Sequence, residues 1–267
     1  MRKLAVCELT FGSGYTFQEE VDEIARLGIP AITLQGAKAE KLGLKRARQI
    51  VRDAGLKVSG YGGGGWFTLP GELKRRVEDG KRRIEEAAEL EADFLLVKAG
   101  PRGSLTYDEA SRLHLDGMRQ IAPAARASGV QLAVEPSHPI FAFNSFIVTL
   151  RDALDLAKQV EGTGVVLDTF HSWWDPRVLG DIKKDCALIY NVQISDYAKS
   201  DQPVVLTTGG PRVALGEGMI PFKEIFHALD TAGYKRYYDI EVIGSFTPAR
   251  QKALVADCKK YFEALWR

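Results

Sequence analysis

The sequence predicts an α/β protein of one domain, residues 1–267, folded as a (β/α)8 TIM barrel. A length of 267 residues suits one such barrel. Eight short apolar runs recur along the chain, each followed by a helix-like pattern or by a loop leading to one. Four glycines stand between a helix-like segment and the next apolar run, as helix C-caps do; they are Gly28, Gly55, Gly129 and Gly233. An open doubly wound sheet is the alternative, but no GxGxxG follows the first run.

The eight expected strands are spread evenly over the chain. They are KLAVCEL (3–9), AITL (31–34), LKVSGYG (56–62), ADFLLVKAG (92–100), VQLAVEP (130–136), TGVVLDTF (163–170), ALIYNVQISD (187–196) and YYDIEVIG (237–244). Amphipathic segments separate them; in TFQEEVDEIARLGI (16–29), for example, the apolar residues recur at helical spacing. The alternation continues to the helical pattern over 251–266, which leaves no room for a second domain.

Composition bounds the function. There are 36 Lys and Arg against 35 Asp and Glu, and a nucleic-acid partner would call for a basic excess or stripe. No stretch approaches about 20 uninterrupted apolar residues, so no membrane span is expected. The three cysteines have no CxxC spacing, which favours a reducing compartment. The opening MRKLAVCELTF is too short and too polar for a signal peptide, so we expect a cytoplasmic protein.

Polar residues end four consecutive expected strands, namely Glu135, Asp168, Gln193 and Glu241. Side chains alternate between the barrel lumen and the helix layer with a period of two residues. On each of these strands the branched apolar residues fall on one face and the polar residue on the other. The polar side chains therefore point into the lumen at the C-terminal end of the barrel, where TIM-barrel active sites lie.

Three carboxylates and an amide in one low-dielectric mouth need a compensating charge, and a divalent cation supplies it. The four oxygen donors of Glu135, Asp168, Gln193 and Glu241 suit Mg²⁺ or Mn²⁺ better than Zn²⁺, which favours nitrogen and sulfur. Manganese or magnesium is the expected cofactor, with cobalt or zinc as alternatives. The competing interpretation is four independent strand-end residues that are solvated or ion-paired at the rim.

Further candidates follow the same strands. His171, three residues past Asp168, is interpreted as a substrate ligand or proton donor, or alternatively as a loop residue packed on tryptophan. His138, three residues past Glu135, also faces the site in the functional interpretation. Trp173, with Trp174 beside it, either stacks on a sugar ring or covers the barrel end.

Two more candidates lie at the third and fourth strands. Lys98 ends the run FLLVK and binds a substrate oxygen or anion, or else forms a rim salt bridge. The stretch GYGGGGW (60–66) lacks the Lys-Ser/Thr of a phosphate-binding P-loop. We expect a mobile loop there, with Trp66 or Phe67 covering the substrate.

Several motifs in this order resemble the xylose-isomerase-like TIM-barrel superfamily, the sugar phosphate isomerase/epimerase group. They are AVEPSHP, VVLDTFHSWWDP, NVQISD, LGEGMIPFKEIFHALDTAGY and DIEV, and the resemblance covers nearly the whole chain. It implies that the metal ligands are Glu135, Asp168, Gln193 and Glu241, that the family histidine is His171, and that the two glutamates act as bases on opposite faces of the substrate.

Two features depart from the ketose epimerases of this group. Gln193 stands where many of them have histidine and resembles the 3-dehydroshikimate dehydratase branch, although other branches also have glutamine there. The arginine that usually follows this strand is missing, and Lys199 stands near its place.

The resemblance implies proton removal next to a carbonyl and a metal-stabilised enediolate. The expected function is a divalent-metal-dependent isomerase or epimerase of a sugar or polyol-like keto substrate, a small-molecule carbohydrate-like partner. Alternatives are a dehydratase of a keto-sugar or keto-cyclitol and a catalytically degenerate sugar-binding barrel. An endonuclease IV-like DNA repair enzyme would need a histidine-rich zinc site, and the chain has four histidines in total. Barrels of this group often pair, so a homodimer is also expected.

Overall fold

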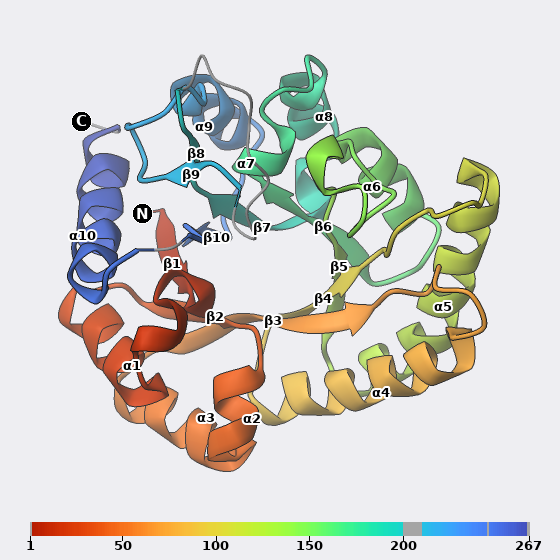
Figure 1. Cartoon of the computed structure of the whole chain (residues 1–267), viewed down its shortest axis with the longest axis horizontal. Coiled ribbons are helices and arrows are strands. Elements are labelled where there is room, and N and C mark those ends of the chain that lie inside the picture. The colour runs from red at the N-terminus through yellow and green to blue at the C-terminus, as the bar shows by residue number, and fades with distance from the viewer. Residues whose placement is uncertain (1, 200–209, 245, 266–267) are drawn as a thin grey trace.

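A computed structural model describes residues 2–199, 210–244 and 246–265. Its centre is a closed barrel of eight parallel strands, seen end-on in Figure 1, in the order β1-β10-β7-β6-β5-β4-β3-β2. The strands are β1 (Lys3–Cys7), β2 (Ala31–Leu34), β3 (Lys57–Gly65), β4 (Phe94–Lys98), β5 (Gln131–Val134), β6 (Thr163–Asp168), β7 (Ile189–Ile194) and β10 (Tyr237–Ile240). The predicted single (β/α)8 TIM barrel is confirmed.

Helices surround the barrel (Figure 1). They are α1 (Phe17–Arg26), α2 (Ala37–Leu42), α3 (Leu44–Asp53), α4 (Leu73–Glu89), α5 (Tyr107–Ala127), α6 (Leu150–Ala157), α7 (Thr169–Ser172), α8 (Val178–Asp185), α9 (Phe222–Thr231) and α10 (Pro248–Ala264). Local sequence explains their ends. Thr16 and Thr106 each form a capping box with a glutamate three residues on, at α1 and α5.

The glycines predicted as helix C-caps have the required backbone. Gly28, Gly55, Gly129 and Gly233 have φ values of 68°, 73°, 70° and 84° and follow α1, α3, α5 and α9. A side chain is strained in this left-handed region, so glycine ends the helix there and turns the chain towards the next strand.

The predicted strand phase is confirmed by the packing. Branched residues of β5, β6, β7 and β10 lie in the large core between barrel and helices; they are Leu132, Val134, Val165, Leu167, Val192, Ile194 and Ile240. Ala133 and Val166, from the opposite faces of β5 and β6, belong to a separate small cluster with Phe94, Leu96 and Tyr190. The residues in phase with Ala133 and Val166 at the strand ends are Glu135 and Asp168.

The glycine-rich stretch is strand rather than loop, because β3 continues to Gly65. A Cβ at Gly65 would lie 2.0 Å from the Lys98 carbonyl oxygen, so the close approach of β3 to β4 requires glycine. Phe67, expected to cover a substrate, is fully buried, and a Cβ on Gly117 of α5 would lie 2.2 Å from its ring. That expectation is wrong for Phe67, because the ring is part of the core.

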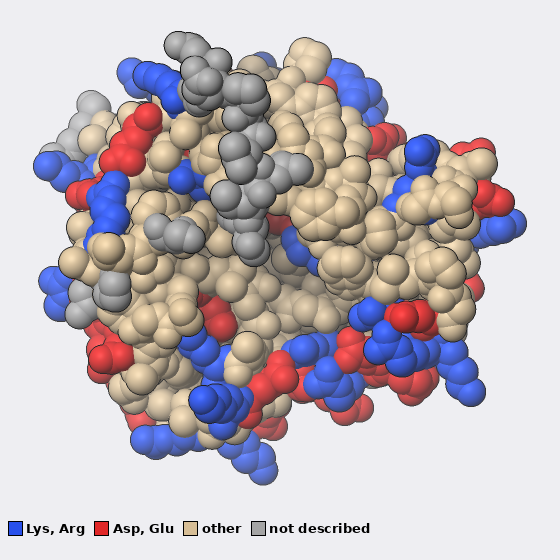
Figure 2. All heavy atoms as spheres, in the orientation of Figure 1, with Lys and Arg blue, Asp and Glu red and all other residues tan. Residues whose placement is uncertain are grey.

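A short antiparallel hairpin of β8 (Asp196–Tyr197) and β9 (Arg212–Val213) follows β7. On the face shown in Figure 2, acidic and basic side chains alternate around the helical rim, and the surface is hollowed near its centre. Among the described residues, no helix combines the length and apolar character needed to cross a bilayer.

Candidate active site

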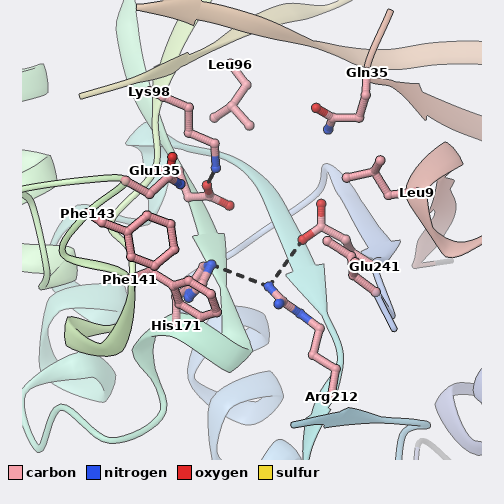
Figure 3. Close-up of a pocket in the computed structure, with 12 residues that line it drawn as sticks. Leu9, Gln35, Leu96, Lys98, Glu135, Phe141, Phe143, His171, Arg212 and Glu241 are labelled. Atoms are coloured by element: carbon pink, nitrogen blue, oxygen red, sulfur yellow. Dashed lines mark hydrogen bonds and ion pairs between the residues drawn. The ribbon is translucent and has the colours of Figure 1, made fainter. Parts of the chain in front are cut away.

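A pocket of about 490 Å³ opens at the C-terminal end of the barrel. One part of its wall is apolar, formed by Leu9, Leu96, Phe141, Phe143 and Ile243. The other part is polar, formed by Gln35, Lys98, Glu135, Asn144, His171, Arg212 and Glu241. In Figure 3, Lys98 and Glu135 lie on one side of this pocket, and Glu241 and Arg212 lie on another. The pocket can therefore enclose a small polar molecule that has one apolar face.

The four predicted strand-end residues are all buried. Glu135 and Glu241 directly follow β5 and β10, and Asp168 and Gln193 lie on the two strands between them. Their exposed fractions are 1% for Glu135, 0% for Asp168, 1% for Gln193 and 5% for Glu241. Buried carboxylates need cations or hydrogen-bond donors, and two cations reach them, Lys98 and Arg212.

Asp168 uses its two oxygens differently. Oδ1 accepts the Phe170 backbone N–H at 2.7 Å, which caps the first turn of α7. Oδ2 accepts from Arg212 Nη2 at 3.0 Å. The hydrogen bond from α7 fixes the carboxylate rotamer, and Oδ2 is left to face the guanidinium of Arg212.

Glu241 is divided in the same way. Oε1 accepts from Gln193 Nε2 at 2.9 Å and from the Cys7 thiol at 3.4 Å. Oε2 lies 3.6 Å from Arg212 Nη2. Burial, and next the nearby Asp168 charge, raise the pKa of Glu241, while Arg212 and Lys98 oppose that rise.

Arg212 comes from β9, and its guanidinium reaches towards His171 and Glu241 (Figure 3). Its Nε donates to Ser195 Oγ at 3.1 Å, and its guanidinium carbon lies 4.0 Å from the Phe170 ring centroid. Only 6% of the residue is exposed. The guanidinium is therefore held by a hydroxyl, an aromatic face and carboxylates together.

Lys98, at the end of β4, forms an ion pair with Glu135. Its side chain is 24% exposed and lines the pocket, while Glu135 is almost fully buried. Burial lowers the pKa of Lys98, and the Glu241 and Asp168 charges oppose this. The ammonium can reach both Glu135 and a molecule in the pocket.

His171 lines the pocket, and its hydrogen bonding fixes its tautomer. The His138 backbone N–H donates to Nδ1 at 3.1 Å, so Nδ1 carries no hydrogen. Burial, and next the Arg212 charge, lower the pKa of His171 well below its usual value. In a neutral ring Nε2 then carries the hydrogen. Nε2 lies 3.6 Å from Asp168 Oδ2 and 3.4 Å from Arg212 Nη2, so His171 presents an N–H donor at the site.

The remaining candidates lie outside the pocket wall. The His138 Nδ1 accepts the Ile140 N–H, and its ring packs 5.6 Å from that of Trp174. Trp173 packs on Tyr197 at 5.4 Å. Trp66 donates its N–H to the Lys98 carbonyl and has a positive φ of 63°. The backbone N–H groups of His138 and Trp66 thus hold His171 and Lys98, which line the pocket, whereas Trp173 contacts no pocket residue in this way among the described residues. Direct substrate contact stays a prediction for all three.

Asp196, at the start of the hairpin, has a structural role. It accepts four backbone N–H groups, from Tyr197, Gly216, Gly218 and Ile220, at 2.8–3.0 Å. It therefore organises the segment that follows Arg212.

Arg212 was not singled out as a site residue from the sequence, and the exposed Lys199 was expected near the arginine position. Arg212 lies 44 residues beyond Asp168 in the chain, and no periodic signal connects the two. The paired β8–β9 hairpin brings them together, and a hairpin prediction could have indicated it.

The donor set fits a divalent ion. One ligand atom each of Glu135, Asp168 and His171 lie within 4.8 Å of one another. Because Nε2 of His171 carries a hydrogen, this nitrogen has no lone pair free for a metal, and His171 is a weaker metal ligand than Glu135 and Asp168. Gln193 Oε1 is buried and lacks a hydrogen-bond partner among the described residues, so a buried oxygen donor is left over.

Comparison with known proteins covers nearly the entire chain. A family model described as "Xylose isomerase-like TIM barrel" matches residues 21–259. A crystal structure of a protein from Sinorhizobium meliloti 1021 is 31% identical, covers 98% of both chains and has a TM-score of 0.88. The zinc-bound IolI protein is 19% identical over 98% of this chain and 97% of its own, with a TM-score of 0.84.

An L-ribulose 3-epimerase is 18% identical over 99% of this chain and 94% of its own, with a TM-score of 0.80. A further epimerase and a probable dehydratase share the fold. A comparison with curated protein sequences found no match.

Proposed function

The chain belongs to the xylose isomerase-like TIM-barrel family, and from this premise we propose that it is a divalent-metal-dependent isomerase or epimerase of a sugar or polyol-like keto substrate. One observation carries the proposal. Two buried carboxylates, Glu135 and Glu241, line one pocket from strands that are separated by the two strands bearing Asp168 and Gln193. Carboxylates placed around one pocket suit removal of a proton at one face of a carbon and its return at another.

The proposed metal ligands are Glu135, Asp168, Gln193 and Glu241. A bound divalent ion would supply positive charge beside the oxygen on which negative charge develops during proton removal. The zinc in the IolI structure and the close group of Glu135, Asp168 and His171 support a divalent ion here.

The chain's own groups supply the proton chemistry. One glutamate takes the proton from the carbon next to the carbonyl, and the other returns a proton on the opposite face. Returning it to the neighbouring carbon instead interconverts aldose and ketose. His171 Nε2–H donates to a substrate oxygen, and Lys98 holds a second oxygen while it neutralises Glu135. Leu96, Phe141 and Phe143 exclude water from the reacting carbon.

The first experiment measures metal content by mass spectrometry on protein purified without chelator or added metal. We expect about one divalent ion per chain in the wild type and loss of that ion in Glu135→Ala. The loaded protein is then incubated with ketopentoses and ketohexoses in deuterated water, and exchange of carbon-bound protons is followed by NMR. Absence of any ion, together with absence of exchange, would instead favour a degenerate barrel.

The matched variant is Glu241→Gln, which keeps the side-chain shape and removes the base. We expect exchange to fall by about 10²–10⁴-fold, the range that general acid–base catalysis contributes, with an unchanged circular dichroism spectrum. Retained exchange in Glu241→Gln would contradict the proposal, because no proton acceptor would then be needed at this position.

A dehydratase of a keto-sugar or keto-cyclitol is the second candidate. Gln193, in the position where many epimerases have histidine, favours it. The same proton removal then precedes loss of a β-hydroxyl, and His171 Nε2–H donates the proton with which the hydroxyl leaves as water. Loss of water produces a conjugated carbonyl compound, which ultraviolet absorbance detects during the same screen. A small carbohydrate-like substrate is common to both proposals, and homodimerisation stays a prediction.

A further inference from the structure

The two carboxylates nearest Arg212 each have one committed oxygen. Asp168 Oδ1 holds the Phe170 N–H, and Glu241 Oε1 holds the Gln193 amide and the Cys7 thiol. The oxygens left over are Asp168 Oδ2 and Glu241 Oε2. These two oxygens are therefore the ones most available to a cation that bridges β6 and β10 through these side chains.

Arg212 Nη2 already faces both of these oxygens, at 3.0 Å from Asp168 Oδ2 and 3.6 Å from Glu241 Oε2. Figure 3 shows the contact with Glu241. It also lies 3.4 Å from His171 Nε2, which carries a hydrogen. A divalent ion coordinates carboxylate oxygen at about 2.0–2.2 Å. An ion bound to both oxygens would therefore compete with Nη2 for them, and two cations on the same pair of oxygens repel strongly in a buried site.

We propose that Arg212 is a built-in counter-ion that occupies the divalent-metal position in the metal-free protein and has to leave Asp168 and Glu241 before the ion binds. This inference rests on the proposed metal site and adds the residue that limits the affinity of that site. Metal uptake is then an exchange of cations on the same two oxygens, rather than the filling of a preformed cage.

Contacts that do not involve the carboxylates hold the guanidinium in readiness. Ser195 Oγ accepts from Nε, and the Phe170 ring lies under the guanidinium plane. Both come from the elements that carry the ligands, since Phe170 belongs to α7 after β6 and Ser195 follows β7. These contacts lower the free energy of the arginine-occupied form, and they therefore weaken apparent metal affinity.

The test is Mn²⁺ titration by calorimetry on wild type and on Arg212→Met, which keeps an unbranched apolar stem and removes the guanidinium with its charge and donors. We expect the Mn²⁺ dissociation constant to fall by about tenfold or more, because the competing charge-assisted hydrogen bond is lost. Thermal unfolding gives a second readout. The metal-free variant melts below metal-free wild type, and added Mn²⁺ raises its melting temperature by more than that of wild type.

A second variant separates exchange from simple loss of charge. Ser195→Ala keeps the arginine charge and loosens its anchor, so we expect an increase in Mn²⁺ affinity that is smaller than in Arg212→Met. Arg177→Met, which removes an exposed arginine paired with Asp175, is the control and should leave affinity unchanged.

The outcomes distinguish this inference from the proposed function. Equal or weaker Mn²⁺ binding by Arg212→Met overturns the exchange while the metal site stands. Tighter binding by Arg212→Met with no change in Ser195→Ala also overturns it, since charge alone then explains the effect. Lack of Mn²⁺ binding by every variant removes the metal site itself.

Discussion

The two ends of the barrel each have a pocket, and the larger one is not where the buried charges lie. The pocket at the N-terminal ends of the strands has a volume of about 620 Å³, against about 490 Å³ at the C-terminal end. Four of its charged residues, Lys3, Glu91, Asp93 and Lys235, are exposed to solvent, and the fifth, Arg236, is half-buried. At the other end, Glu135, Asp168, Glu241 and Arg212 are buried. Burial of charge, rather than volume, therefore distinguishes the candidate site.

The physical reason is the free energy of removing an ion from water. Exposed ion pairs contribute about 0–1 kcal/mol to the free energy of unfolding, so their presence at a surface does not indicate a functional site. Buried carboxylates each lose several kcal/mol of hydration, which their partners return only with good geometry. Among the described residues, the carboxylates of Glu135, Asp168 and Glu241 exceed the two cations paired with them, Lys98 and Arg212, by one charge when all five groups are charged. A fold has no structural need for such a cluster, whereas a metal or substrate site does.

The largest expected difference between the two ends comes from neutralising one carboxylate at each end in separate variants. Asp168→Asn keeps the Oδ1 acceptor for the Phe170 N–H and removes the negative charge. We expect loss of bound Mn²⁺ and a decrease in carbon-proton exchange of about 10²–10³-fold, as removal of an electrostatic group from a catalytic site gives. Asp93→Asn, the matched change at the N-terminal end, should leave both within about twofold. Similar losses in the two variants would refute the distinction between the ends.

A buried ionisable group that lies in neither pocket shows what burial alone does to such a group. His114 of α5 is 1% exposed, packs against Phe67 and Phe146, and has neither ring nitrogen hydrogen-bonded among the described residues. Burial lowers the pKa of His114 to about 4. The unfolded chain, with a pKa near 6.5, then binds more protons than the folded chain between these values. The stability that this group contributes is present above pH 6.5 and is lost as the pH falls towards 4.

His114→Phe should flatten this pH dependence. We expect the free energy of unfolding of the wild type to fall by about 3 kcal/mol between pH 7 and pH 4 through this one group, and the variant to lack that part of the decrease. Urea denaturation at several pH values measures it, and the slope against pH is independent of any packing cost of the larger ring. An identical slope in the two proteins would show that His114 finds a hydrogen-bond partner when protonated.

Most of the fold was predictable because its signals are local. A run such as VVLD contains both its strand character and its phase, and the small cluster with Ala133 and Val166 has the predicted inward side. The same phase predicted that Glu135 and Asp168 lie at one end of the lumen. The glycine run was misinterpreted because glycine is common both in loops and where two backbones touch. The approach of Gly65 to Lys98 depends on a neighbouring strand, which the local sequence does not show.

Arg212 shows why the site was less predictable than the fold. Its partners Asp168 and Glu241 lie 44 residues before it and 29 residues after it in the printed sequence. The pairing of β8 with β9 positions Arg212, and this pairing cannot be predicted from composition or from residue spacing. The Nε2–H of His171 likewise follows from a single backbone donor at His138, which only coordinates reveal.

The smallest expected effect tests the N-terminal end directly. Arg236 lies there with its guanidinium carbon 4.2 Å from the centroid of the Tyr190 ring, and it donates to Gln131 Oε1 at 2.8 Å. It thus joins β10, β7 and β5 at the N-terminal end, as Arg212 joins strands at the C-terminal end. The contacts of Arg236 with an aromatic ring and an amide point to a structural role. Arg236→Met should lower the free energy of unfolding by about 1 kcal/mol and leave Mn²⁺ affinity unchanged. A change in Mn²⁺ affinity would mean that a substitution at the N-terminal end alters the metal ligands at the C-terminal end. The two ends would then be one functional unit.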